Sequence, residues 1–297
     1  MTTAPAFVLG GHRRRSLRWA ASLWRVTKKN PVGMAGFAIV FAYVIVALLA
    51  DIVAPYGSLD QELSATLQAP SASHIMGTDT LGRDVFSRLV YGARISLQVG
   101  FLSVLLGISA GALWGMIAAY SGRWVDTLSM RIVDVWMTVP TLILALLLVS
   151  LLEPSVTNVT LALGIAVVPR ATRLVRSSSL SVMQEPYMES AVCVGARTPR
   201  IILRYLLPNV TAPIIVFATG ILAANILAEA TLSFLGLGIP PPHPSWGRML
   251  SGNNLIFFET APWLGIFPGL FLAGLVLAVN LAGDMLRDVW DPRLRGA

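Results

Sequence analysis

The side chains that most often carry out catalysis are few and scattered in this sequence. The three histidines, His12, His74 and His243, lie far apart, and no two metal-binding residue types stand at the spacing of a zinc site. The phosphate-binding pattern G-x-x-x-x-G-K-[ST] does not occur, and Lys28 and Lys29 are the only lysines. These observations predict no catalytic residue, no metal site and no cofactor on this chain.

Two acidic residues stand inside apolar stretches that are long enough to cross a bilayer. A charged group there costs roughly 2.5–3.5 kcal/mol on insertion scales, so each should face a partner or water. Glu229 follows Asn225 by four residues, which places both on one helix face. That face either lines a polar translocation path or makes interhelical polar contacts. Asp134 lies beside Arg131, and we expect it to be a paired anchor.

A cluster of charges, Asp79, Arg83 and Asp84, stands in the segment G-T-D-T-L-G-R-D. Its two glycines and alternating charges predict a tight, internally paired turn. Two interpretations stay open. The cluster is either a contact surface for another protein on the periplasmic side or a local salt bridge worth about 0–1 kcal/mol.

Small residues are expected to allow close packing. Gly107, Gly111 and Gly115 repeat at every fourth position, which predicts tight helix contacts, most simply within one subunit. Cys193 is the only cysteine, so no intrachain disulfide forms, and we expect it to pack as a small apolar side chain.

The segment 185–208 predicts two short helices joined by a bend. Pro186 suits the first turn of a helix. Small side chains at and near Ala191 share one helical side and permit close approach to another surface. Gly195 allows a backbone turn that other residues resist, and Pro199 starts the second helix.

The elements that carry these residues are membrane spans. Of the 297 residues, 55% are apolar and only 12% are charged, whereas soluble domains carry roughly 25% charged residues. The net charge of +7 comes mainly from arginines between the apolar runs, which is typical of cytoplasmic loops and argues against a nucleic-acid partner. Six stretches have the length of about 20 residues that a span needs: Val32–Val53, Ile95–Ala119, Met130–Leu152, Val156–Val175, Pro213–Leu235 and Leu264–Leu286.

The positive charges fix the expected orientation. With the N-terminus inside, the inner segments hold 18 Lys and Arg and the outer segments hold 4. We therefore expect both termini to be cytoplasmic. The inner segments are 1–30, 120–131, 170–208 and 284–297.

The basic N-terminal segment, residues 1–30, has a leader-like run at His12–Arg15. The apolar stretch begins only near Val32 and is too long for a cleavable signal, so we expect an uncleaved first span. Leu17 and Trp24 recur at helical spacing, which predicts a short helix on the inner membrane face. A disordered basic tail is an equally good interpretation of the first fifteen residues.

The segment 185–208 also resembles a known motif. Glu189-Ser190-Ala191, three residues, Gly195, nine residues and then Tyr205-x-Leu207-Pro208 is similar to the EAA loop of ABC importer permeases, E-A-A-x3-G-x9-I-x-L-P. The chain departs from it with Ser190 and Tyr205. The resemblance implies that this loop docks on the ATP-hydrolysing subunit, through Glu189, Ser190, Ala191, Gly195, Pro199, Leu207 and Pro208.

Further stretches resemble one branch of that family, the C-type permeases of dipeptide and oligopeptide importers. These stretches are residues 76–100, 232–238, 244–250 and 267–295, and the whole resemblance covers roughly residues 30–297. Nickel and glutathione importers use similar permeases, so the solute does not follow.

The resemblance implies an all-α integral membrane protein of the bacterial inner membrane, with six transmembrane helices in the type I ABC importer permease fold. It implies a second homologous permease, two cytoplasmic ABC ATPases that carry ATP and Mg²⁺, a periplasmic or lipid-anchored solute-binding protein, and membrane lipid. An ion-coupled transporter and a membrane scaffold are the alternatives. The expected segments are a cytoplasmic segment (1–30), a first span with a periplasmic loop (31–92), a five-helix core (93–286) and a cytoplasmic tail (287–297).

Overall fold

The computed structural model describes residues 30–252 and 256–290, and its regular elements are helices. The expectations for residues 1–29, including the interfacial helix, and for the tail after residue 290 lie outside the described residues. In chain order the elements are α2 (Pro31–Leu48), α3 (Ala50–Val53), the 3-10 helix η1 (Leu63–Ala65), α4 (Val85–Ser121), α5 (Arg123–Met137), α6 (Thr141–Leu151), α7 (Val156–Met183), α8 (Pro186–Cys193), α9 (Thr198–Arg200), the π-helix η2 (Ile201–Leu206), α10 (Leu207–Phe234), α11 (Trp246–Met249) and α13 (Trp263–Trp290).

Five helical segments are long and apolar enough to cross a membrane, and a bent pair, α5 with α6, provides a sixth span. The third span expected at Met130–Leu152 corresponds to this pair, but it is not one straight helix, because the two helices meet at an angle of 83°. Pro140 explains the break. A residue before proline is disfavoured in the helical conformation, and Pro140 itself is extended, with ψ at 135°.

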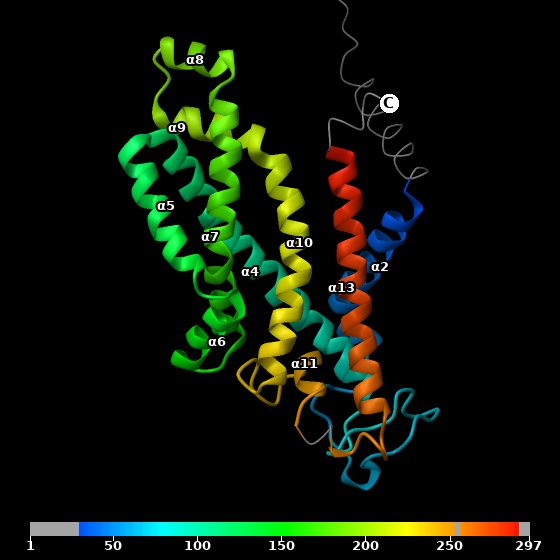
Figure 1. The fold of residues 1–297 in the computed structure, drawn as a ribbon. Coiled ribbons are helices and arrows are strands. Elements are labelled where there is room, and N and C mark those ends of the chain that lie inside the picture. The colour runs from blue at the N-terminus through cyan, green and yellow to red at the C-terminus, as the bar shows by residue number, and fades with distance from the viewer. Residues whose placement is uncertain (1–29, 253–255, 291–297) are drawn as a thin grey trace, which may run out of the picture.

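Helix α4 is longer than the apolar pattern predicted. It has 37 residues and begins at Val85 rather than Ile95. The side chain of Asp84 caps this end, since its Oδ2 accepts a hydrogen bond from Ser87 N at 2.8 Å. From there α4 crosses the bundle diagonally, behind α7 and α10 (Figure 1).

The first span is held to the rest of the bundle by close packing and one ion pair. A Cβ atom at Gly36 would lie 2.8 Å from the carbonyl oxygen of Ala278, so α2 touches the backbone of α13 directly. Just after α2, Asp51 of α3 accepts a hydrogen bond at its Oδ2 from Arg94, at 2.9 Å. This hydrogen bond, with a second from the Tyr91 hydroxyl, holds the pKa of Asp51 below its usual range.

The start of α2 and the end of α13 lie at the same end of the bundle, where Asn30 Nδ2 donates to Asp288 Oδ2 at 3.1 Å. Helix α8 projects from this end as well (Figure 1). The long loop that contains η1 lies at the opposite end. The arrangement therefore places the 185–208 loop on the same side as the two ends of the described chain.

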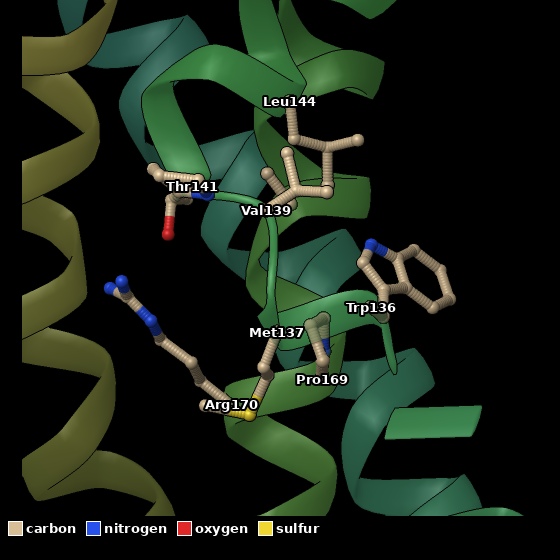
Figure 2. Close-up of a pocket in the computed structure, with 9 residues that line it drawn as sticks. Trp136, Met137, Val139, Thr141, Leu144, Pro169 and Arg170 are labelled. Atoms are coloured by element: carbon tan, nitrogen blue, oxygen red, sulfur yellow. The ribbon is translucent and has the colours of Figure 1, made fainter. Parts of the chain in front are cut away.

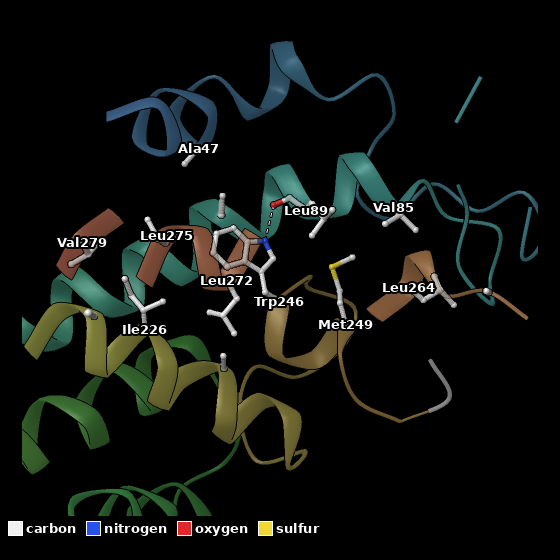
Figure 3. Close-up of a cluster of buried hydrophobic side chains, with 14 residues drawn as sticks. Ala47, Val85, Leu89, Ile226, Trp246, Met249, Leu264, Leu272, Leu275 and Val279 are labelled. Carbon is white, nitrogen blue, oxygen red and sulfur yellow. Dashed lines mark hydrogen bonds between the residues drawn. The ribbon is translucent and has the colours of Figure 1, made fainter. Parts of the chain in front are cut away.

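Two contacts set how α4 packs. On one side, Trp246 is fully buried, and its Nε1 donates to the carbonyl oxygen of Leu89 at 3.0 Å, inside a cluster drawn from α4, α10 and α13 (Figure 3). On the other side, the glycine series faces α7 of the same chain. A Cβ at Gly111 would lie 2.5 Å from Ala171 Cβ, and one at Gly115 would lie 2.6 Å from Thr172 O. Packing of this series within the subunit is confirmed.

Candidate functional site

The 185–208 loop forms two helices with a sharp reversal between them. Helix α8 has Pro186 in its first turn and ends in a Schellman motif. Gly195 has a φ of +77°, its N–H donates to Val192 O at 2.9 Å, and Ala196 N donates to Ala191 O at 3.1 Å. The bend predicted at Gly195 is thus a hydrogen-bonded helix end that requires a left-handed residue.

The face of this loop that points away from the helix bundle, called its outer face below, is exposed and partly apolar. Tyr187, Val192 and Val194 are 42%, 55% and 87% exposed. Glu189 is exposed on the same short helix. The expectation that Cys193 packs as a small apolar side chain was wrong, because it is exposed on this face. An exposed apolar patch beside a rigid turn is typical of a protein-binding surface.

The inner face of the loop is buried against two long helices. Met188 of α8 and Ile201 and Leu206 of η2 form a cluster with Met116 of α4 and Val175 of α7. The π-helix runs directly into α10, and π-helices are frequent at functional sites. A displacement of the loop would therefore act first on α4, α7 and α10.

The other predicted residues of the loop differ in their exposure. Ser190 and Pro199 are exposed, Ala191 is buried beside Met188, Leu207 is half-buried, and Pro208 is exposed in the first turn of α10.

Glu229 lies in the buried interior and joins three segments. Its side chain is fully buried, at 0% exposure. Ser96 of α4 donates to its Oε2 at 3.0 Å, and Ser233 of α10 donates to its Oε1 at 2.8 Å. Ser245, the N-cap of α11, also hydrogen-bonds this carboxyl. The geometry matches the interhelical alternative, since Glu229 pins α4 and α11 to α10.

Because Glu229 accepts hydrogen bonds from serine hydroxyls, we expect Glu229→Gln to keep both the fold and the uptake activity. Glu229→Leu removes the acceptors and leaves buried hydroxyls unpaired, which should lower the free energy of unfolding by at least about 2 kcal/mol. Thermal unfolding of the purified complex in detergent measures this difference. Loss of uptake in Glu229→Gln at unchanged thermal stability would contradict the structural role.

Asn225 shares the face of Glu229, as predicted, but has a different partner. Its Nδ2 donates at 2.8 Å to the Oγ of Ser103, which follows Ser96 by seven residues on α4. Asp134 is paired, as expected, and its partner is Arg173 of α7 rather than the neighbouring Arg131. The bend between α5 and α6 brings α5 alongside α7, which the sequence order alone does not show.

The outer-loop charges divide into two groups. Asp79 and Arg83 form an ion pair at 2.7 Å, and Asp79 Oδ1 also accepts from the N–H groups of Leu81 and Arg83. Asp84 is separate. It contacts His74 Nδ1 at 3.0 Å in addition to capping α4. Both carboxylates are buried and paired within the loop, so they hold the loop in shape.

Two adjoining cavities lie where α6 meets α7. One, of about 60 Å³, is bordered by Trp136, Pro169 and Arg170 (Figure 2). The second, of about 120 Å³, lies between α6, α7 and α10 and is bordered by Arg170, Thr141 and Asn225 among mainly apolar residues. Arg170 borders both cavities.

Comparison with protein families supplies the context for these features. Residues 111–296 match the model described as "Binding-protein-dependent transport system inner membrane component". Residues 18–70 match the model described as "N-terminal TM domain of oligopeptide transport permease C".

Several curated relatives are similar over nearly their whole length. The chain is 42% identical to the dipeptide transport system permease protein DppC of Alkalihalophilus pseudofirmus, over 93% of this chain and 92% of the relative. It is 45% identical to a probable peptide ABC transporter permease protein of Sinorhizobium fredii, over 91% of each chain. It is 39% identical to a glutathione transport system permease protein of Escherichia coli, over 92% of this chain and 90% of the relative.

One solved structure supports the architecture. A chain of the MetNI methionine ABC transporter, in an inward-facing conformation, matches with a TM-score of 0.55 at 18% identity. The match covers 68% of this chain and 96% of that one. At this level of identity the similarity concerns the fold alone.

Proposed function

Because the chain belongs to the family of binding-protein-dependent transport system inner membrane components, and is thus a multi-pass permease subunit of an ABC importer, we propose that it forms the translocation path for peptides together with a second homologous permease. Both termini of the chain lie in the cytoplasm in this arrangement. Two cytoplasmic ATPase subunits bind and hydrolyse ATP with Mg²⁺, and a periplasmic or lipid-anchored protein delivers the solute. The chain itself supplies the path and the mechanical connection.

The observation that carries this proposal is the geometry of the 185–208 loop. It combines an exposed apolar face at Val192 and Val194, a turn fixed by Gly195, and an inner face packed on α4 and α7. A groove on an ATPase would cover the exposed face. Closure of the ATPases would then move the loop, and the packed inner face would pass this movement to the spans.

The names of the relatives support peptides as the solute class. They are described as permeases for dipeptides, peptides and glutathione. These solutes share amide bonds and a free carboxylate. We therefore assign short peptides to this chain, with glutathione-like compounds in the same chemical class.

The docking surface can be tested by cross-linking. Cys193 is the native thiol on the exposed face of α8, so it should form a disulfide or a bismaleimide link with a cysteine placed in the groove of the partner ATPase. The expected result is a cross-linked pair in membranes that contain the assembled importer. The yield should change when ATP is added, because the groove moves relative to the loop.

A control variant uses the opposite end of the molecule. Ser64 lies in the exposed outer loop, so a chain with Cys193→Ser and Ser64→Cys should give no link to the ATPase. Failure to cross-link at every position from Glu189 to Arg200 would refute docking on this loop.

A further inference from the structure

Three arginines stand on α7, and they differ in their partners. Arg176 forms an ion pair with Asp126 of α5, and Arg173 forms one with Asp134, which also belongs to α5. Arg170 lies one turn further toward the outer side, where α5 has ended and α6 supplies only apolar and hydroxyl side chains. Among the described residues, no hydrogen bond or ion pair is formed by the guanidinium of Arg170.

The charge count placed Arg170 in the inner segment 170–208, but in the structure it lies within the candidate span Val156–Met183, and it is exposed. At 1.5 Å per residue it is about 21 Å along α7 from Val156, in a hydrocarbon layer about 30 Å thick. Its side chain borders the 120 Å³ cavity between α6, α7 and α10 and extends away from Pro169 (Figure 2). Thr141 and Asn225 are the other polar side chains on this cavity. One cation, one hydroxyl and one amide thus border an otherwise apolar space, and the Asn225 amide already donates to Ser103.

A guanidinium at this depth needs an anion or water, because charged groups inside a membrane are costly unless they are paired. We propose that Arg170 binds the carboxylate of the solute during its passage and thereby favours solutes with a free carboxyl terminus. This inference rests on the proposed function. It adds a residue that determines specificity within the path.

A solute carboxylate fits the site better than a permanent partner on another subunit. The two neighbouring arginines show that fixed pairs on α7 are made within the chain, with aspartates of α5. The cavity beside Arg170 lies between three helices of this chain and has room for a small group rather than for a helix. A guanidinium binds a carboxylate through two parallel hydrogen bonds, and a solute that must move on is best held by one such contact.

The test measures ATP-driven uptake by the complete importer in proteoliposomes, with its own binding protein. Two probes are compared, dialanine and dialanine amide, which differ only in the terminal carboxylate. The ratio of their uptake rates is measured in the wild type and in Arg170→Gln. Because the same binding protein serves both versions, its own preference cancels when the two ratios are compared. Arg170→Gln should lower the ratio by about tenfold, mainly through slower uptake of the free acid, given the strength of a charge-assisted hydrogen bond.

Two further variants separate specificity from folding. Arg173→Gln neutralises a paired arginine of the same helix and should reduce the amount of folded complex without changing the ratio. Arg170→Lys keeps the charge but loses the two parallel hydrogen bonds, so it should retain only part of the preference.

An equal loss of uptake for both probes in Arg170→Gln would assign the arginine to a contact with a neighbouring subunit and overturn the inference. An unchanged ratio at normal uptake would overturn it too. If the wild type took up neither probe, the proposed peptide specificity would fail, and this inference with it.

Discussion

Replacing Gly195 with Trp is expected to abolish ATP-driven uptake while the chain still inserts into the membrane. A side chain in this left-handed turn costs roughly 1–2 kcal/mol. Among the described residues, apart from the two chain neighbours, no atom lies within 4 Å of a Cβ placed there. The bundle therefore has no reason to collapse. The bulky ring instead occupies the outer face of α8, which is the face available to the ATPase. Uptake in proteoliposomes and the amount of co-purifying ATPase measure the effect.

The matched control is Gly195→Asn, since asparagine adopts left-handed conformations more readily than most residues. This variant should retain most of the uptake. Wild-type uptake by the Trp variant would show that the turn at Gly195 has no part in energy coupling. Loss of the chain from the membrane would show instead that the turn is needed for folding.

The second large effect is expected at Gly111, where α4 touches the backbone of α7. A side chain there would meet Ala171 Cβ at 2.5 Å and Val168 O at 2.7 Å, and neither atom belongs to a flexible group. Gly111→Val should therefore separate the two helices. Overpacking of this kind usually costs about 1–3 kcal/mol, and here the obstruction is backbone. We expect a large fall in thermal stability in detergent and a loss of assembled importer.

Gly220 offers the control. It is a helical glycine of α10, and in the part of the chain that the structure describes no atom outside its own helical backbone and chain neighbours lies within 4 Å of an added Cβ. Gly220→Val changes the same residue type in another span and should leave thermal stability close to that of the wild type. Equal stability of the two variants would contradict the close approach of α4 and α7.

The sequence predicted the spans well because apolar length is their main signal. Its error at the start of α4 has a non-local cause. Helix α4 extends back to Val85 because two arginines that lower the hydropathy are satisfied in the folded chain. Arg88 donates to Ser58 O, and Arg94 donates to Ala47 O. Hydropathy has no means of counting partners that are supplied by a different part of the chain.

The candidate site was predictable where its determinants are local. The turn at Gly195 follows from the residues around it, and the shared face of Asn225 and Glu229 follows from helical spacing. Their partners do not. Ser96 and Ser103 lie more than a hundred residues earlier, and only the packing of α4 on α10 brings them close. Arg170 was overlooked for the opposite reason, since its significance lies in a missing partner.

The length of α4 has a consequence for the membrane around the protein. At 1.5 Å per residue, its 37 residues extend about 55 Å, whereas the hydrocarbon layer is about 30 Å thick. Its diagonal course takes up part of this excess (Figure 1), and we expect the first turns of α4, which carry Arg88 and Arg94, to extend beyond the lipid chains. A thicker bilayer would set α4 more upright, and a thinner one would increase its tilt. Because α2, α7 and α10 all pack on α4, the lipid composition of the membrane would bias the angles at which these three helices cross α4.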